Sequence, residues 1–198
     1  MIATLSSEGV VLSHRAAARL HGLDGFRDAP VEVSVRRGRR PRVEGVVHQA
    51  AVLHRCDIME IGSIAVTTVE RTLCDLGSVV SRDRVEQALD SALRRGMTPA
   101  RLRRVARRLH RPGQRGTGTV LDLLDDPGRR GRLSDSWFER LVERIVRQPG
   151  MPPVVRQHDV RDAYGDLVAR VDVAIPSVKV AIECHSREFH FGPRRERL

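Results

Sequence analysis

Aromatic residues, lysine and paired cysteines are what this sequence has least of. Aromatics make up 3% of its 198 residues, too few for the base-stacking surface of a single-strand binder. The three cysteines lie far apart without a CxxC pair, which argues against both a disulfide framework and a structural zinc knuckle. Long apolar runs and a secretory signal pattern are also missing, so we expect a cytoplasmic protein that does not contact a membrane.

The charge of the chain is strongly positive. The formal net charge is +10, which favours a polyanion such as the backbone of duplex DNA as partner. Lys179 is the only lysine, so the arginine excess also fits coding bias in a G+C-rich genome. Charge therefore favours DNA without identifying it.

The residues up to Asp126 predict a domain of helices and a β-hairpin. Apolar and polar residues alternate over 31–35, a second strand-like stretch covers 43–47, and the basic turn between them contains Arg39 and Arg40. We expect a hairpin with a cationic tip. A third apolar stretch covers 64–66, and cap and glycine signals predict helices at 14–21, from about 69, at 84–95 and at 99–109.

Two of these helices carry specific expectations. The first should bury Ala17 and Leu20 and end at Gly22. The last should expose a wholly basic face, because residues 94–121 contain nine arginines and no carboxylate. A solvated amphipathic helix explains such a face as well as a nucleic-acid surface does. The candidate nucleic-acid-binding residues are Arg101, Arg104, Arg108, Arg39 and Arg40.

A segment rich in glycine, proline and charge predicts a linker over 127–133, between domains of residues 1–126 and 134–198. The second domain opens with the capping pattern Ser136-Trp137-Phe138-Glu139. Three strands should follow this helix, over 154–160, 167–175 and 178–184. Together the two domains predict an α+β fold class.

Two acids interrupt the apolar pattern of the last two strands. If Pro176-Ser177 is a two-residue turn, Asp172 opposes Ala181, and Glu183 lies diagonally across on the same face. Two such carboxylates suit Mg²⁺ or Mn²⁺ and hence phosphodiester hydrolysis, with His185 orienting the attacking water.

Each candidate residue also has a structural interpretation. Glu139 can serve only to cap its helix, and Asp172 can form an ion pair with Arg170 on the same strand face. Glu183 can mark the point where its strand reaches solvent. His185 and His190 are of a type that lies more often at the surface or the edge of the core than in a catalytic site.

The segment from about residue 132 to the end, with Asp172 and the run Glu183-Cys184-His185-Ser186-Arg187-Glu188-Phe189-His190, resembles the C-terminal domains related to Vsr (very-short-patch repair) endonucleases. These domains belong to the PD-(D/E)XK superfamily. The resemblance implies a partial restriction-endonuclease-like α/β domain, a helix plus three strands without the final helix and strand. It further implies a magnesium-dependent site at Glu139, Asp172, Glu183 and His190. His185 and Ser186 replace the aspartate and glycine of the family's motif.

Residues 11–124 resemble the middle region of actinobacterial proteins that join such a nuclease-like domain to an AbiEi-type antitoxin or transcriptional-regulator domain. The matching runs are 12–23, 66–76 and 88–96. Such relatives usually begin with a winged helix-turn-helix, so the resemblance implies that both ends of this chain are shortened. It adds a second hypothesis, a non-enzymatic DNA-binding regulator or antitoxin with a cognate toxin, and a third, a decayed reading frame without activity.

Overall fold

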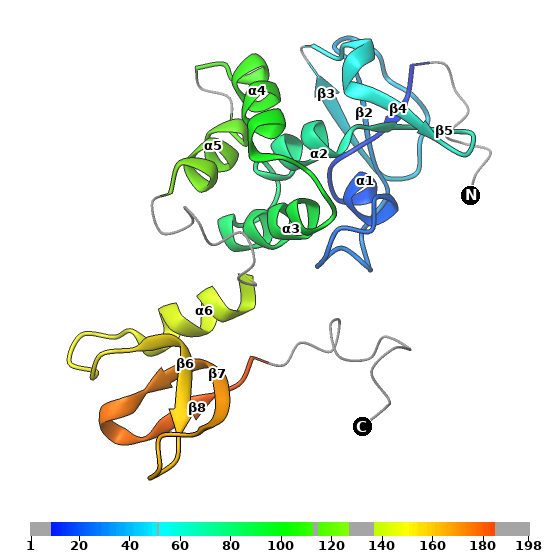
Figure 1. Cartoon of the computed structure of the whole chain (residues 1–198). Helices are drawn as coiled ribbons and strands as arrows, with labels where there is room; N and C mark the ends of the chain where they lie inside the picture. The colour runs from blue at the N-terminus through cyan, green and yellow to red at the C-terminus, as the bar shows by residue number, and fades with distance from the viewer. Residues whose placement is uncertain (1–8, 51, 113–114, 127–136, 185–198) are drawn as a thin grey trace. The chain divides into compact units, whose positions relative to one another are not determined.

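The chain forms two compact units, Met1–Ser134 and Asp135–Leu198, in the computed structural model (Figure 1). The structure describes residues 9–50, 52–112, 115–126 and 137–184, so the expected linker over 127–133 lies outside the described residues. Helices combine with one mixed and one antiparallel sheet, and the predicted α+β class is confirmed. None of the helices in the described ranges has the length and apolar character needed to cross a membrane.

A five-stranded mixed sheet lies in the first unit, with the strand order β3-β2-β1-β5-β4. Its strands are β1 (Val11–Leu12), β2 (Glu32–Arg36), β3 (Val46–Ala50), β4 (Ile58–Ile61) and β5 (Ile64–Thr67). β2 and β3 run parallel, with Glu32 beside Val46, so the predicted hairpin is wrong. The connection between them contains two glycines at positive φ, Gly38 and Gly45, and returns the chain to the start of β2. Apolar alternation predicts a strand but not its direction.

Five helices complete the first unit. They are α1 (His14–Leu20), α2 (Val69–Leu76), α3 (Arg82–Arg94), α4 (Pro99–Leu109) and α5 (Thr117–Asp125). The hydroxyls of Thr68 and Thr98 accept hydrogen bonds from backbone amides in the first turns of α2 and α4, as the cap signals predicted. α5 and the β4 strand were not predicted, because α5 has no side-chain cap and β4 is short.

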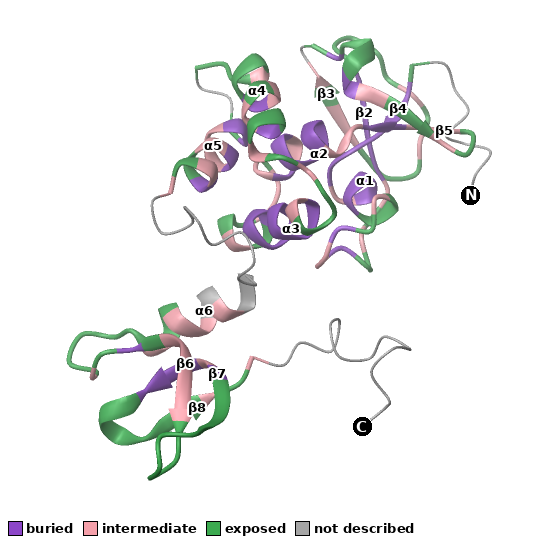
Figure 2. Ribbon diagram, in the orientation of Figure 1, coloured by how far each residue is buried: buried purple, intermediate pink, exposed green. Residues whose placement is uncertain are grey.

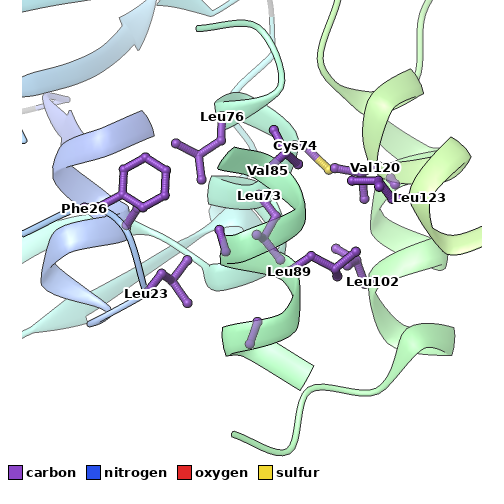
Figure 3. Close-up of a cluster of buried hydrophobic side chains, with 14 residues drawn as sticks. Leu23, Phe26, Leu73, Cys74, Leu76, Val85, Leu89, Leu102, Val120 and Leu123 are labelled. Atoms are coloured by element: carbon purple, nitrogen blue, oxygen red, sulfur yellow. The ribbon is translucent and has the colours of Figure 1, made fainter. Parts of the chain in front are cut away.

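Two buried clusters hold the first unit together. The larger one joins the helices through side chains such as Leu73, Leu89 and Leu102, which have no exposed surface (Figure 3). The smaller one packs α1 against β2 and β5. Figure 2 shows the buried residues of this unit in purple. Leu20 was expected in the core but is 36% exposed. The buried face of α1 is made of small residues instead, Ala16–Ala18, which allow the helix to approach its neighbours closely.

The second unit packs a helix on a three-stranded antiparallel sheet of order β6-β7-β8. Its elements are α6 (Trp137–Val146), β6 (Val155–Arg161), β7 (Leu167–Ile175) and β8 (Val180–Ile182). Val173 and Ile175 of β7 pack with Val142 and Val146 of α6 in a small apolar cluster. β7 is the central strand, so each of its residues has a neighbouring strand on both sides.

Candidate functional site

Asp172 lies in the central strand of the second unit, half-buried, and is held from both sides. Its Oδ1 accepts a hydrogen bond from the Gln157 side-chain amide of β6 (3.1 Å), and its Oδ2 accepts one from the Cys184 backbone N–H (2.8 Å). A carboxylate offers about four lone-pair positions, so each oxygen keeps capacity for one further contact. The carboxylate therefore has a fixed orientation and unused acceptor sites.

The register between β7 and β8 sets the position of Glu183. Val173 pairs with Ile182 and Ile175 pairs with Val180, so one step further along both strands puts Asp172 directly across from Glu183. The predicted pairing of Asp172 with Ala181 is wrong by two residues. The predicted two-residue turn at Pro176-Ser177 is wrong as well. Residues 176–178 form a 3₁₀ turn, and Lys179 follows with a left-handed backbone conformation.

A shift of two residues leaves the strand face of each side chain unchanged, because side chains alternate with a period of two. When the alternation is continued one residue past Ile182, where β8 ends, Asp172 and Glu183 lie on the same side, and directly opposed residues lie closer than diagonal ones. Glu183 is exposed, whereas Asp172 is half-buried. The pair thus presents one fixed carboxylate and one that reaches solvent.

Glu139 of α6 reaches the same place through Gln157. The amide of Gln157, 3.1 Å from Asp172, is also 3.4 Å from Oε2 of Glu139. The Arg156 guanidinium lies 3.5 Å from that oxygen and 3.3 Å from Glu143. Glu139 is thus more than a helix cap, although a cation already offsets part of its charge.

The pKa of the Cys184 thiol reflects the burial and the charges around it. Burial, and then the negative charges of Asp172, Glu139 and Glu183 in that order, raise its pKa to about 11, while Arg156 opposes them. All three carboxylates therefore act on one point of the structure. The thiol stays protonated near neutral pH and packs beside the apolar cluster under α6.

The donor groups of this site fit a divalent metal ion in kind. Carboxylate oxygens are the ligands that Mg²⁺ and Mn²⁺ prefer, so Asp172 and Glu183 are a suitable pair of donors. Within the described ranges, no group of three or more His, Cys, Asp or Glu side chains has a geometry that holds a metal. The described protein ligands are thus two carboxylates, and water would complete the coordination shell, as is usual for Mg²⁺. His185 and His190 lie outside the described residues.

The ion pair between Asp172 and Arg170, the structural alternative for Asp172, is not formed. Arg170 lies 3.7 Å from Asp159 of β6 instead, and the Arg170 side chain is exposed whereas Asp159 is half-buried. The register explains this result, because Asp159 sits directly across from Arg170. Gln157 was not among the residues predicted from the sequence, because its position next to Asp172 depends on a strand register that no local pattern encodes.

The candidate nucleic-acid-binding arginines of α4 are only partly available. Arg101 forms an ion pair with Glu70, and Arg108 forms one with the buried Asp57. The expectation of a wholly basic, unneutralised face is therefore wrong, since acids far away in the sequence supply the missing partners. Arg104 is exposed and forms no ion pair with the residues that the structure describes.

The two candidate arginines of the β2–β3 connection are exposed. The backbone carbonyl of Arg39 accepts a hydrogen bond from the Gln49 side chain (2.6 Å), which ties this connection to β3. Arg40 follows directly. The structure places these residues at the end of the sheet and the arginines of α4 on a helix outside it, in the same unit (Figure 1).

Comparison with known proteins adds no relative: no family model, curated protein or solved structure matches the chain. The support for a function therefore comes from the geometry of the described residues and from the resemblances in the sequence.

Proposed function

We propose that the second unit is a DNA-directed nuclease domain that hydrolyses phosphodiester bonds with the help of Mg²⁺ or Mn²⁺. The observation that supports this most directly is the register between β7 and β8, which puts Glu183 across from Asp172 when it is continued one residue past the end of β8. The resemblance to Vsr-like PD-(D/E)XK domains names the same two residues. The strand register and the Vsr-like sequence motif thus support the same candidate site.

Each residue of the site has a distinct role in this proposal. Asp172 and Glu183 hold the ion, and Gln157 fixes the Asp172 carboxylate while linking it to Glu139. Glu139 is a positioning residue, because it acts on Asp172 through that amide. A bound divalent ion would stabilise the negative charge that develops on the scissile phosphate. His185 is proposed to orient water, and His190 to assist as in the family's motif.

The proposed substrate is the backbone of duplex DNA. The net charge of +10 favours approach to a polyanion, and binding should weaken steeply with salt as counterions are released. Within α4 the contribution falls to Arg104, because Arg101 and Arg108 are already paired with carboxylates.

The test is nicking of supercoiled plasmid by the full chain with Mg²⁺ or Mn²⁺ and, separately, with excess EDTA. We expect metal-dependent nicking that Asp172→Ala and Glu183→Ala abolish. Asp166→Ala is the matched control, because this carboxylate lies in the exposed β6–β7 turn of the same unit. Nicking that survives Asp172→Ala comes from elsewhere and contradicts the proposal.

A second candidate function is a non-enzymatic DNA-binding regulator or antitoxin, with a toxin as partner. The exposed Arg40 and Arg104 of the first unit favour it, because neither forms an ion pair with a described residue. Salt-sensitive binding of plasmid without cleavage, weakened by Arg40→Ala and Arg104→Ala and unaffected by Asp172→Ala, would favour the regulator over the nuclease.

A further inference from the structure

The first unit contains a pocket that the proposed nuclease site does not use. Its volume is about 500 Å³, and residues of β2, β3, α1, α2 and the end of α4 line it. Small-molecule sites commonly have volumes of about 300–1,000 Å³, but most are apolar. This pocket is lined by arginines, histidines and one aspartate, so its lining suits a polar ligand.

Two of the lining arginines hold the wall of the pocket. Arg71 is almost fully buried, donates to Asp75 (2.8 Å) and to the Val52 carbonyl (3.1 Å), and lies 3.5 Å from the buried Asp57. Arg108 pairs with the other oxygen of Asp57. These cations are neutralised by the protein, so they shape the pocket and leave little charge for a ligand.

Two other lining arginines supply a charge that the described residues do not neutralise. Arg111 and Arg115 are exposed and form no ion pair with the residues that the structure describes. The guanidinium of Arg111 is instead oriented by the backbone carbonyls of Arg108 (3.0 Å) and His110 (2.8 Å). A pair of available guanidinium groups is the arrangement that binds a phosphate.

Asp75 gives the pocket an unused hydrogen-bond acceptor. Its Oδ1 accepts from Arg71, but its Oδ2 is inaccessible to solvent and has no hydrogen-bond partner among the described residues. A buried acceptor without a partner is destabilising. A ligand N–H group placed there would recover that free energy.

The rings of His14 and His48 add a flat wall. Their centroids are 3.6 Å apart with an interplanar angle of 20°. His14 is buried with a positive φ of 50°, an unfavourable backbone conformation for this residue, and its Nδ1 is hydrogen-bonded to Ser13 (2.9 Å). Burial, and then the neighbouring His48, lower the pKa of His14 to about 3, so its ring is neutral. Aromatic rings such as that of His48, whose side chain is 24% exposed, are surfaces on which nucleobases stack.

We infer that this pocket binds a nucleotide, with its phosphate at Arg111 and Arg115, an N–H group of its base at Asp75 and the base plane against the two stacked histidines. The arrangement combines a phosphate site, a buried acceptor and a planar wall, which are the parts of a nucleotide that proteins recognise. The ligand is either a free nucleotide or one nucleotide of a single strand. The inference does not depend on the nuclease proposal, because all of its residues belong to the first unit.

Isothermal titration of the full chain in excess EDTA tests this inference, since EDTA suppresses metal-dependent cleavage. The probes are the common nucleoside monophosphates, inorganic phosphate and a short single-stranded DNA. We expect saturable binding of at least one nucleotide probe, tighter than that of phosphate. The double variant Arg111→Ala/Arg115→Ala should weaken it by about tenfold or more, because two charge-assisted contacts are lost.

The matched control is Arg19→Ala/Arg107→Ala, which removes the same charge from exposed positions of α1 and α4 outside the pocket. It should change the affinity by less than about twofold, as expected of exposed charges. Asp75→Asn should reduce the preference among the bases while phosphate-dependent binding remains. Tight binding of monophosphates indicates a free nucleotide as ligand, and binding of the DNA alone indicates a strand.

The inference is overturned if neither a nucleoside monophosphate nor the single-stranded DNA binds saturably. It is also overturned if inorganic phosphate binds as tightly as the nucleotides, or if the control variant weakens binding as much as the pocket variant. These results concern the first unit alone, so they leave the plasmid-nicking test of the second unit unaffected.

Discussion

Glu32 is the residue whose removal should have the clearest effect on the first unit. It lies in β2 with no exposed surface and accepts hydrogen bonds from the Arg15 side chain (3.0 and 2.8 Å) and the Arg15 backbone N–H (2.7 Å). His48 contacts the same carboxylate at 3.2 Å. Glu32→Gln keeps the shape of the side chain but removes its charge, so these donors lose a charged acceptor.

The magnitude follows from the pKa of Glu32. Burial alone would raise this pKa, but the hydrogen bonds from His48 and Arg15 outweigh burial and lower it from 4.5 to about 2. At about 1.4 kcal/mol per pH unit, this difference corresponds to about 3 kcal/mol of folding stability. Because the pKa is lowered in the folded state, the contribution is complete above about pH 5 and is lost as the pH falls towards 2.

Urea unfolding followed by circular dichroism, at several pH values between neutral and strongly acidic, measures this effect. Glu32→Gln should be less stable than the wild type by about 3 kcal/mol at neutral pH, and the difference should shrink steadily on acidification. Glu44→Gln, at an exposed position just before β3, is the control and should be nearly neutral. A difference that is independent of pH, or equal to that of the control, would refute the reasoning.

Two further results are expected. Asp57 is buried between two arginines, so Asp57→Asn should cost about 3–5 kcal/mol in urea unfolding, whereas Asp125→Asn, in an exposed pair, should cost less than about 1 kcal/mol. Equal losses would show that the buried network is not formed. Burial raises the thiol pKa of Cys74 to about 12 and of Cys184 to about 11, so both are protonated at about pH 8, whereas Cys56 is exposed. Maleimide should therefore label one thiol quickly, and Cys56→Ser should remove that phase; a second fast thiol would contradict the described burial.

Local signals predicted the helices well. The α4 helix begins and ends where the Thr98-Pro99 cap and the apolar spacing indicated, and α3 buries the face predicted from its period. Both signals act within one turn of helix, so the sequence contains them completely. The shared face of Asp172 and Glu183 stays a prediction, which a register error of two residues leaves unchanged because side chains alternate with a period of two.

Contacts between distant segments were not predictable in this way. β3 runs parallel to β2, although the alternating pattern fits either direction equally well. The partners of Arg101 and Arg108, Glu70 and Asp57, lie more than one element away from α4. Counting the charges of residues 94–121 alone therefore overestimated the positive charge that is left unpaired. The folded chain brings carboxylates from distant segments next to these arginines.

Mn²⁺ binding, followed by the electron paramagnetic resonance signal of the free ion, tests the central proposal most directly. We expect saturable binding to the full chain that Asp172→Asn and Glu183→Gln each abolish, with Asp166→Asn unchanged. Both substitutions remove a ligand charge and preserve side-chain shape. Wild-type protein that binds no Mn²⁺, or Asp172→Asn that binds as the wild type does, would contradict the metal site.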